Sequence, residues 1–308
     1  MTTLTEQRII FFTFAGRKAN MEIQRPYIER LLAAYPTAEL HLWDLTREAD
    51  DHNYIMAWAD SHAQVAYVGH LHPGHPYVCL GDYRGAGHPR CVCIKHKPPY
   101  EEPYRYYRNH PHRGSRVPDC NDDTVFVKFD DDVLWMDVDQ FGEVMSFLET
   151  HPSAVASANV TNNAVCAKYE PSLRDLVQSR YNLPGTTPDQ DRNWWSLHTS
   201  ADFAMLSHGW HNTMLVDGFR PPDREPVRTR SGEAISINFI AMKYPVLRAA
   251  AHRMRSGRLG DEGTFDQMLP WIIPNFRVAH LSFGPQEHDL DPQVTENIRK
   301  QYRIEGDI

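Results

Sequence analysis

The sequence is poor in cysteine, has no long apolar run and carries no excess of positive charge. Five cysteines among 308 residues are an odd and sparse set, which is typical of a reducing compartment rather than of a disulfide-stabilised secreted domain. No apolar run approaches the roughly 18 residues of a membrane span. The first 14 residues lack the basic segment of a secretory signal. We therefore expect a cytoplasmic protein without a membrane partner.

Forty acidic residues outnumber 32 basic ones, and the formal net charge is −8. This balance argues against a protein that coats nucleic acid through bulk positive charge. Charged residues make up 23% and aromatic residues 11% of the chain, a composition that excludes a disordered protein. The length suits one large α/β domain or two modest ones.

The first half of the chain alternates strand and helix signals. The apolar run Ile9–Phe14 predicts a buried strand, Met21–Tyr35 has helical spacing, and Glu39–Asp44 alternates like a second strand. This β-α-β order predicts a parallel sheet with crossover helices. We expect small hairpins and loops in residues 60–120, which are rich in histidine and proline.

Further along, strands are predicted at Val125–Phe129, Ala154–Val160 and Arg277–Phe283, and helices at Val138–Glu149, Ser236–Arg255 and Thr264–Ile273. The segments 182–200 and 219–232 are rich in turn residues, and the tail from residue 285 is polar. The expected fold is therefore α/β, with a Rossmann-type sheet flanked by helices.

Three consecutive aspartates, Asp130, Asp131 and Asp132, follow the apolar segment Val125–Phe129. Ligands of open α/β sheets bind at the carboxyl ends of the strands. Oxygen ligands there suit Mg²⁺ or Mn²⁺, which completes its coordination with a diphosphate and water. The alternative is that these residues only cap the following helix. One aspartate suffices for a cap, and three adjacent carboxylates repel one another without a cation. We therefore favour a metal site.

The segment VFVKFDDDVLWMD resembles the DxD motif of the GT-A-fold, metal-dependent glycosyltransferases, and similar elements follow in the order expected for that family. FTFAGRKAN is similar to the loop that contacts the nucleotide, Gly260–Gly263 is similar to the acidic acceptor-side motif, and VAHLSFGPQ is similar to the segment of the late metal-binding histidine. The resemblance covers nearly the whole chain. The histidine- and proline-rich residues 60–120 depart from it.

The resemblance implies a single large GT-A-like domain made of a nucleotide-sugar-binding half, residues 1–150, and an acceptor half, residues 151–308. It implies a nucleotide-diphosphate sugar as donor, with a UDP-sugar favoured, and Mn²⁺ or Mg²⁺ as cofactor. The implied metal ligands are Asp130, Asp132 and His280, and the implied catalytic carboxylates are Asp261 and Glu262. The implied donor contacts are Thr13, Ala15, Arg17, Asp44, Asp130 and Asp131.

Each of these assignments has an alternative in ordinary structure. Arg17 binds the diphosphate or is a solvated loop charge. Asp261 and Glu262 accept the acceptor's proton or cap a helix, and the two roles are compatible. His280 completes the metal shell or is a core histidine.

Two stretches run against the acidic net charge. Residues 219–258 contain nine Lys/Arg and three acids, a net +6, and Lys95–Arg116 contains six basic residues among four tyrosines. Basic residues interleaved with aromatics bind phosphates and stack bases, although a charge run also forms an ordinary solvated face. The pattern further resembles glycosyltransferases of bacterial viruses, some of which modify hydroxymethylated pyrimidines in DNA. Such a DNA base is our leading acceptor. The alternative acceptors are a polysaccharide, a protein or a small molecule. The alternative to an enzyme is a nucleotide-sugar-binding module without turnover.

Three smaller clusters leave alternatives open. The cysteines and histidines of residues 62–120 contain enough ligands for zinc, but they lack a Cys-x-x-Cys spacing, so buried thiols and surface histidines are favoured. Asn159, Asn162 and Asn163 either bind a sugar or make a turn. Trp194 and Trp195 either line a pocket for an extruded base or pack under a loop.

Overall fold

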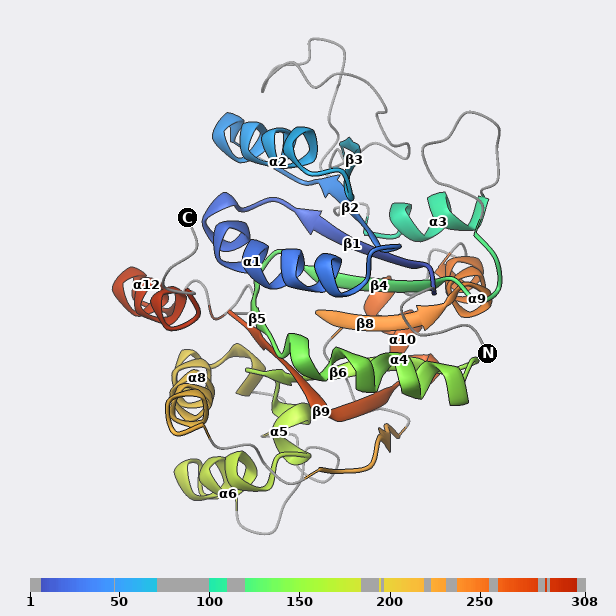
Figure 1. The fold of residues 1–308 in the computed structure, drawn as a ribbon. Helices are drawn as coiled ribbons and strands as arrows, with labels where there is room; N and C mark the ends of the chain where they lie inside the picture. The colour runs from blue at the N-terminus through green and yellow to red at the C-terminus, as the bar shows by residue number, and fades with distance from the viewer. Residues whose placement is uncertain are drawn as a thin grey trace.

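The computed structural model describes residues 7–46, 48–70, 100–109, 120–183, 194, 197–218, 223–230, 237–254, 260–281, 286 and 289–303. Within these ranges the chain forms one α/β domain around a mixed sheet of nine strands (Figure 1). The strand order is β3-β2-β1-β4-β8-β6-β9-β5, and β7 pairs with β9. The predicted fold class is confirmed.

The strands are β1 (Ile9–Ala15), β2 (Glu39–Asp44), β3 (Val65–His70), β4 (Val125–Asp130), β5 (Val133–Met136), β6 (Val155–Thr161), β7 (Val227–Arg228), β8 (Phe239–Lys243) and β9 (Trp271–His280). The helices are α1 (Lys18–Ala34), α2 (Ala49–Ser61), α3 (Glu102–Asn109), α4 (Phe141–Thr150), α5 (Ala164–Lys168), α6 (Pro171–Arg180), α8 (Ala201–Val216), α9 (Tyr244–Met254), α10 (Asp261–Met268) and α12 (Pro292–Gln301). Two short 3₁₀ turns are η2 (Val138–Gln140) and η3 (Leu197–Thr199).

The strand directions bring distant parts of the chain to one edge of the sheet. Strands β1, β2, β3 and β4 are mutually parallel, β8 is antiparallel to both β4 and β6, and β9 is parallel to β6. The carboxyl ends of β1, β2, β4, β6 and β9 therefore share an edge, together with the amino end of β8. Binding sites of open α/β sheets form at this kind of edge.

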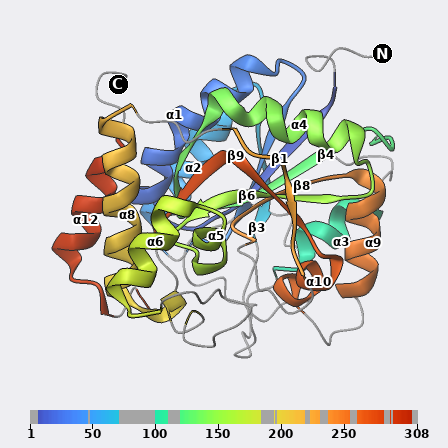
Figure 2. The ribbon, with the colours of Figure 1, turned by 90° about the horizontal axis from the view of Figure 1, so that it is seen from below.

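Aromatic side chains fill the core on both faces of the sheet. On one face Phe11 of β1 packs on Phe141 of α4, with ring centroids 5.6 Å apart. On the other face Phe12 packs on Tyr104 and Tyr107 of α3, at 5.5 and 5.3 Å. Viewed along the sheet, α1 and α4 lie on one side and α3, α9 and α10 on the other (Figure 2). Successive residues of β1 thus point to opposite, fully apolar layers.

The structure confirms most of the predicted strands and corrects several predicted helices. Residues 239–243 and 271–273, predicted as helix, are strands β8 and β9. The sequence Phe239–Lys243 is buried throughout, and a short apolar run fits a buried strand as well as a buried helix. Helix α3 lies where loops were predicted. Its tyrosines Tyr104 and Tyr107 are fully buried under the sheet, which stabilises a helix in a segment of strongly polar composition.

No helix in the described part of the chain is long and apolar enough to span a bilayer. Residues 71–99 and 110–119, part of the segment where small hairpins and loops were expected, lie outside the described residues, as do most members of the candidate zinc cluster. Of that cluster, the Nδ1 of His62 accepts a hydrogen bond from the backbone N–H of Gln64 at 3.3 Å, and Cys120 packs against the core.

Candidate functional site

The three aspartates form the tight connection between β4 and β5, and the backbone of this turn is held on three sides. The Nε2 of Gln24, in α1, donates to the carbonyls of Asp130 and Val133, both at 2.8 Å. The backbone N–H of Asp130 donates to the carbonyl of Asn238 at 3.0 Å, and Leu281 donates to the carbonyl of Asp132 at 2.8 Å. The carboxylates are therefore presented from a fixed backbone.

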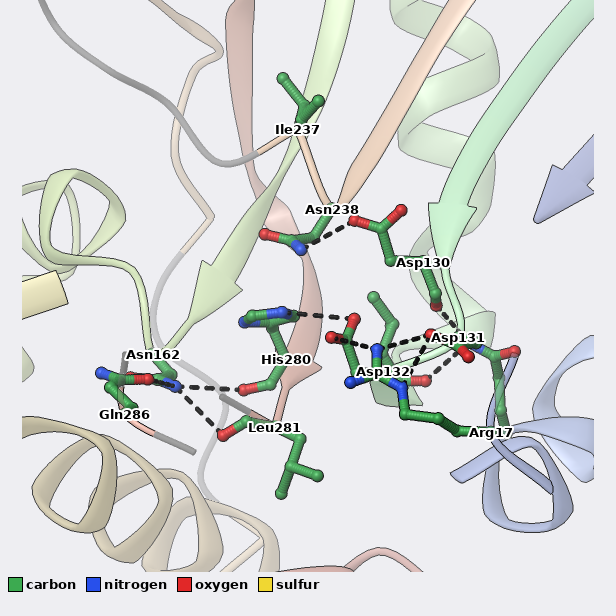
Figure 3. A network of polar contacts seen from close by, with 12 residues as sticks. Arg17, Asp130, Asp131, Asp132, Asn162, Ile237, Asn238, His280, Leu281 and Gln286 are labelled. Carbon is green, nitrogen blue, oxygen red and sulfur yellow. Dashed lines mark hydrogen bonds and ion pairs between the residues drawn. The ribbon is translucent and has the colours of Figure 1, made fainter. Parts of the chain in front are cut away.

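Arg17 is bound to two of these carboxylates. Its Nη2 lies 2.6 Å from Asp131 Oδ1 and 2.6 Å from Asp132 Oδ2, and its Nε donates to the same Asp131 oxygen (Figure 3). The other Asp131 oxygen accepts the backbone N–H of Gly16 at 2.9 Å. Burial works against the charge of Arg17, but Asp132 and Asp131 raise its pKa well above its usual value. These ion pairs and hydrogen bonds thus connect the loop after β1 to the turn after β4.

Asp130 faces different partners. Its Oδ1 lies 2.6 Å from the Nζ of Lys128, and its Oδ2 accepts a hydrogen bond from Asn238 at 2.9 Å. Burial raises the pKa of Asp130 to about 6, although Lys128 lowers it. The buried Lys128 also donates to the carbonyl of Ile237 and stands over the ring of Phe14. The chain therefore supplies two cations, Arg17 and Lys128, to the three carboxylates.

Asp132 and His280 converge on one point. Their Oδ1 and Nε2 atoms are 3.3 Å apart, and both side chains are about nine-tenths or more buried (Figure 3). Burial favours the neutral acid, but the charges of His280 and Arg17 hold the pKa of Asp132 below its usual range. The structure brings together two of the three residues expected to bind a metal. Asp130 is the third, and its carboxylate is directed to Lys128 and Asn238 instead.

The Asp132–His280 pair fits a divalent cation in its spacing and chemistry. Two neighbouring ligands of an octahedral ion with bonds of about 2.1 Å lie about 3 Å apart, close to the observed separation. Mg²⁺ sites commonly use one or two carboxylates and take further oxygens from phosphate and water. Within the described ranges no group of three or more His, Cys, Asp or Glu side chains is arranged to hold a metal ion. The protein's part of such a shell would therefore be this pair.

A network behind His280 fixes the end of β9. Asn162, which follows β6 with a left-handed φ of 66°, donates to the carbonyl of Leu281 at 3.1 Å and to Gln286 at 2.9 Å (Figure 3). His208 of α8 also contacts the Leu281 carbonyl through its Nε2, at 2.9 Å. The side chain of Asn163 caps α5 by accepting the N–H of Cys166. Asn162 and Asn163 therefore act here as turn residues that position the histidine.

The remaining donor-side residues predicted from the sequence are buried. Thr13 and Ala15 lie within β1 and are fully enclosed, and the Thr13 hydroxyl has no hydrogen-bond partner. Asp44 is also fully buried. Its Oδ1 accepts from the backbone and hydroxyl of Thr46, and its Oδ2 contacts His52 and Tyr67. The structure thus directs Asp44 inward, where it ties together β2, α2 and β3.

The predicted acid pair begins α10. Asp261 is buried and accepts the backbone N–H of Glu262 at 3.0 Å, whereas Glu262 is exposed. The link between this helix and the sheet is Tyr104, which the sequence analysis included only as one of the four tyrosines of the basic stretch Lys95–Arg116. Its ring packs on Phe265 of α10, and its buried hydroxyl has no hydrogen-bond partner. Burial first, then the charges of Asp261 and Asp130, raise the pKa of the Tyr104 phenol far above 10.

Nothing in the sequence indicates the contact of Tyr104 with Phe265, because this contact arises only from the packing of α3 against α10. For Trp194 the structure favours packing: its side chain is fully buried in a small second core with Leu173 and Phe203. Trp195 lies outside the described residues.

Neither a family model nor a curated protein sequence matches the chain.

Proposed function

We propose that this protein is a metal-dependent glycosyltransferase that uses a nucleotide-diphosphate sugar. The observation that carries the proposal is the convergence of Asp132 and His280, with Arg17 alongside, at the carboxyl edge of an α/β sheet. Such an edge binds phosphorylated ligands in open sheets. A carboxylate beside an imidazole suits Mn²⁺ or Mg²⁺, and the resemblance of the DxD segment to the GT-A family points to the same chemistry.

In this proposal the residues of the chain prepare the donor side. Asp132 and His280 would hold the ion, which would neutralise charge on the departing diphosphate. Arg17 lowers the pKa of Asp131 and of Asp132 against the effect of burial and fixes their orientation. Its side chain is 40% exposed, so it can also reach an oxygen of the diphosphate. Lys128 and Asn238 each bind one oxygen of Asp130, so we assign Asp130 no bond to the ion.

On the acceptor side, one carboxylate at the start of α10 accepts the proton of the acceptor hydroxyl. The hydroxyl oxygen then bonds to the anomeric carbon, and the bond from that carbon to the diphosphate oxygen breaks. The electron pair leaves with the nucleoside diphosphate. We place Asp261 in this role because it begins α10, and α10 packs through Phe265 on Tyr104, whose ring also packs on Phe12 of β1 beside the strand that ends in the aspartates. The exposed Glu262 is the second candidate.

For the acceptor we propose a hydroxymethylated pyrimidine in DNA. Support comes from the two basic stretches of the sequence, and incubation of the protein with hydroxymethylated and unmodified DNA tests it. A sugar-sized mass increment on the modified nucleoside is the expected result. A polysaccharide, protein or small-molecule acceptor predicts no increment on either DNA but continued hydrolysis of the donor.

The variants Asp132→Asn and His280→Gln test the metal and the enzyme together. We expect each to weaken Mn²⁺ binding, followed by calorimetry, at least about tenfold and to reduce sugar transfer and donor hydrolysis in parallel. Asp139→Asn, an exposed residue of the η2 turn, is the matched control. Wild-type Mn²⁺ affinity in both site variants would refute the metal assignment. Metal and donor binding without turnover by the wild type would instead identify a binding module.

A further inference from the structure

An open cavity of about 390 Å³ lies between helices α3 and α9, away from the aspartate turn. Arg108 lines it from α3, and Pro245, Arg248, Ala249 and His252 line it from α9. Figures 1 and 2 show the two helices side by side on one face of the sheet, and the hydroxyl of Tyr244 donates to the carbonyl of Tyr107 at 3.2 Å between them. The lining from α9 recurs every three or four residues, so it is one exposed helical face.

The cations of this cavity have no counter-ion among the residues that the structure describes. In the described part of the chain, Arg108 and His252 have no hydrogen-bond or ion-pair partner, and Arg248 contacts only the ring of Tyr244, with its Cζ 5.7 Å from the ring centroid. None of the described residues that line the cavity is acidic. An exposed cavity with two guanidinium groups and an imidazole attracts anions.

Other cations of the same two basic stretches are paired within the protein. Arg105 binds Glu101 and Glu102, which precede it by four and three residues in the chain. Arg224 binds the buried Glu170 at 2.6 Å, and Lys243 lies 3.2 Å from Asp123. Arg108 and Arg248, which come from different stretches, remain available, and the packing of α3 on α9 brings them to one cavity.

The cavity lies toward the opposite edge of the sheet from the candidate site. Tyr100, before α3, packs on Phe14 at the carboxyl end of β1, whereas Tyr107, beside Arg108, packs on Phe126 near the amino end of β4. Phe14 lies opposite Asp130, and Phe126 precedes Asp130 by four residues on β4, so a rise of about 3.3 Å per residue separates the two places by roughly 13 Å along the sheet. The diphosphate of a donor held at Asp132 would not reach this cavity.

We propose that the α3–α9 cavity binds phosphate groups, and that they belong to a polynucleotide. Guanidinium groups match phosphate oxygens in a planar, paired geometry, and a base can stack on the guanidinium of Arg248, which lies over the buried ring of Tyr244. The phosphates of one strand of B-DNA recur about every 3.4 Å along the helix axis, so about four base pairs span the distance to the aspartate turn. The proposal that a polynucleotide binds here depends on the proposed function only if that polynucleotide is also the sugar acceptor.

Binding of a fluorescent DNA duplex of about 20 base pairs tests this without donor or metal. For the double variant Arg108→Gln/Arg248→Gln we expect affinity to fall at least about tenfold and the slope of log affinity against log salt to lose about two units. The control Arg30→Gln/Arg174→Gln removes the same charge from two other exposed helix positions, and we expect it to change neither quantity by as much.

The outcomes separate the two proposals. Equal affinity and salt slope in the cavity and control variants would overturn polynucleotide binding here, whether or not the protein transfers sugar. Inorganic pyrophosphate, added during thermal unfolding, distinguishes a free phosphate as the ligand. Stabilisation by pyrophosphate that only the cavity variant loses, with unchanged DNA affinity, would refute the polynucleotide. A loss of DNA affinity in the cavity variant together with absent sugar transfer would refute only the enzyme.

Discussion

The Oδ1 of Asp132 lies 3.3 Å from the Nε2 of His280, and the pairing of two strands puts it there. Strand β5 starts directly after Asp132 and runs antiparallel to β9, with Val133 opposite His280. The backbone N–H of Leu281 then donates to the carbonyl of Asp132, so main chain and side chains meet at the same place. A residue expected in the donor half and one expected in the acceptor half thus share one site.

Gly16 is the position where an added methyl group disturbs the site most directly. A Cβ there would lie 3.2 Å from Asp131 Oδ2 and 3.2 Å from the carbonyl of Leu45. We expect Gly16→Ala to lower the free energy of unfolding by about 1–2 kcal/mol and to weaken donor binding. Gly142→Ala has no atom within 4 Å of the new Cβ, and we expect it to be neutral or stabilising. Urea unfolding compares the two, and equal stability would contradict the tight contact at Gly16.

Tyr104 and Tyr107 form a matched pair on one helix. The hydroxyl of Tyr107 accepts from Trp43 at 3.0 Å and lies 2.9 Å from His41, whereas that of Tyr104 is unpartnered. We expect Tyr107→Phe to cost about 1–3 kcal/mol of stability, because it leaves the Trp43 N–H unsatisfied. Tyr104→Phe should leave stability unchanged or raise it, while lowering the rate of sugar transfer. A Tyr104→Phe protein that is destabilised as much as Tyr107→Phe would show that the hydroxyl is already hydrogen-bonded.

Glu170 is a buried anion between two arginines. Its Oε2 lies 2.6 Å from Arg224 and 3.1 Å from Arg277, which belongs to β9 three residues before His280. We expect Glu170→Gln to lower the free energy of unfolding by about 3–5 kcal/mol, because it leaves the buried Arg277 and the half-buried Arg224 without their counter-ion. Asp175→Asn, at an exposed pair on α6, should change it by less than about 1 kcal/mol. Denaturant unfolding of both proteins decides the matter, and similar values would mean that solvent screens Glu170.

Stability should fall at acid pH through His211. Burial lowers its pKa from 6.5 to about 3, with smaller contributions from His208 and Arg277. Below pH 6.5 the unfolded chain takes up a proton that the folded protein excludes, so the free energy of unfolding decreases as pH falls from 6.5 toward about 3. The limiting slope is about 1.4 kcal/mol per pH unit.

The variant His211→Phe keeps an aromatic ring against Trp135 and Tyr302. We expect its stability to decline less steeply over the same pH range, as measured by urea unfolding at several pH values. An unchanged slope would mean that His211 is protonated in the folded state or that another group dominates the acid response.

Much of the sheet could be predicted from local pattern. The run Ile9–Phe14 and the run before Asp130 are short, bounded by polar residues and rich in β-branched and aromatic side chains, a pattern that favours a buried central strand over a helix. Strand β8 was not predicted from the sequence because Phe239–Lys243 continues without a break into helix α9. Helix α3 was not predicted because its apolar contacts, Phe12 and Phe126, lie far away in the sequence.

By itself, the sequence determined an α/β sheet with three aspartates at the carboxyl end of a buried strand, because strand periodicity and the position of a strand's end are local properties. Lys128 faces Asp130 because the two lie two residues apart on β4, but tertiary structure decided the other partners. Strand order placed Arg17 against Asp131 and Asp132, pairing of β5 with β9 brought His280 to Asp132, and packing of α3 on α9 brought Arg108 to Arg248. The sequence argument that three carboxylates need a metal ion left out the protein's own cations. Charge compensation depends on distance in space, which composition and spacing along the chain do not specify.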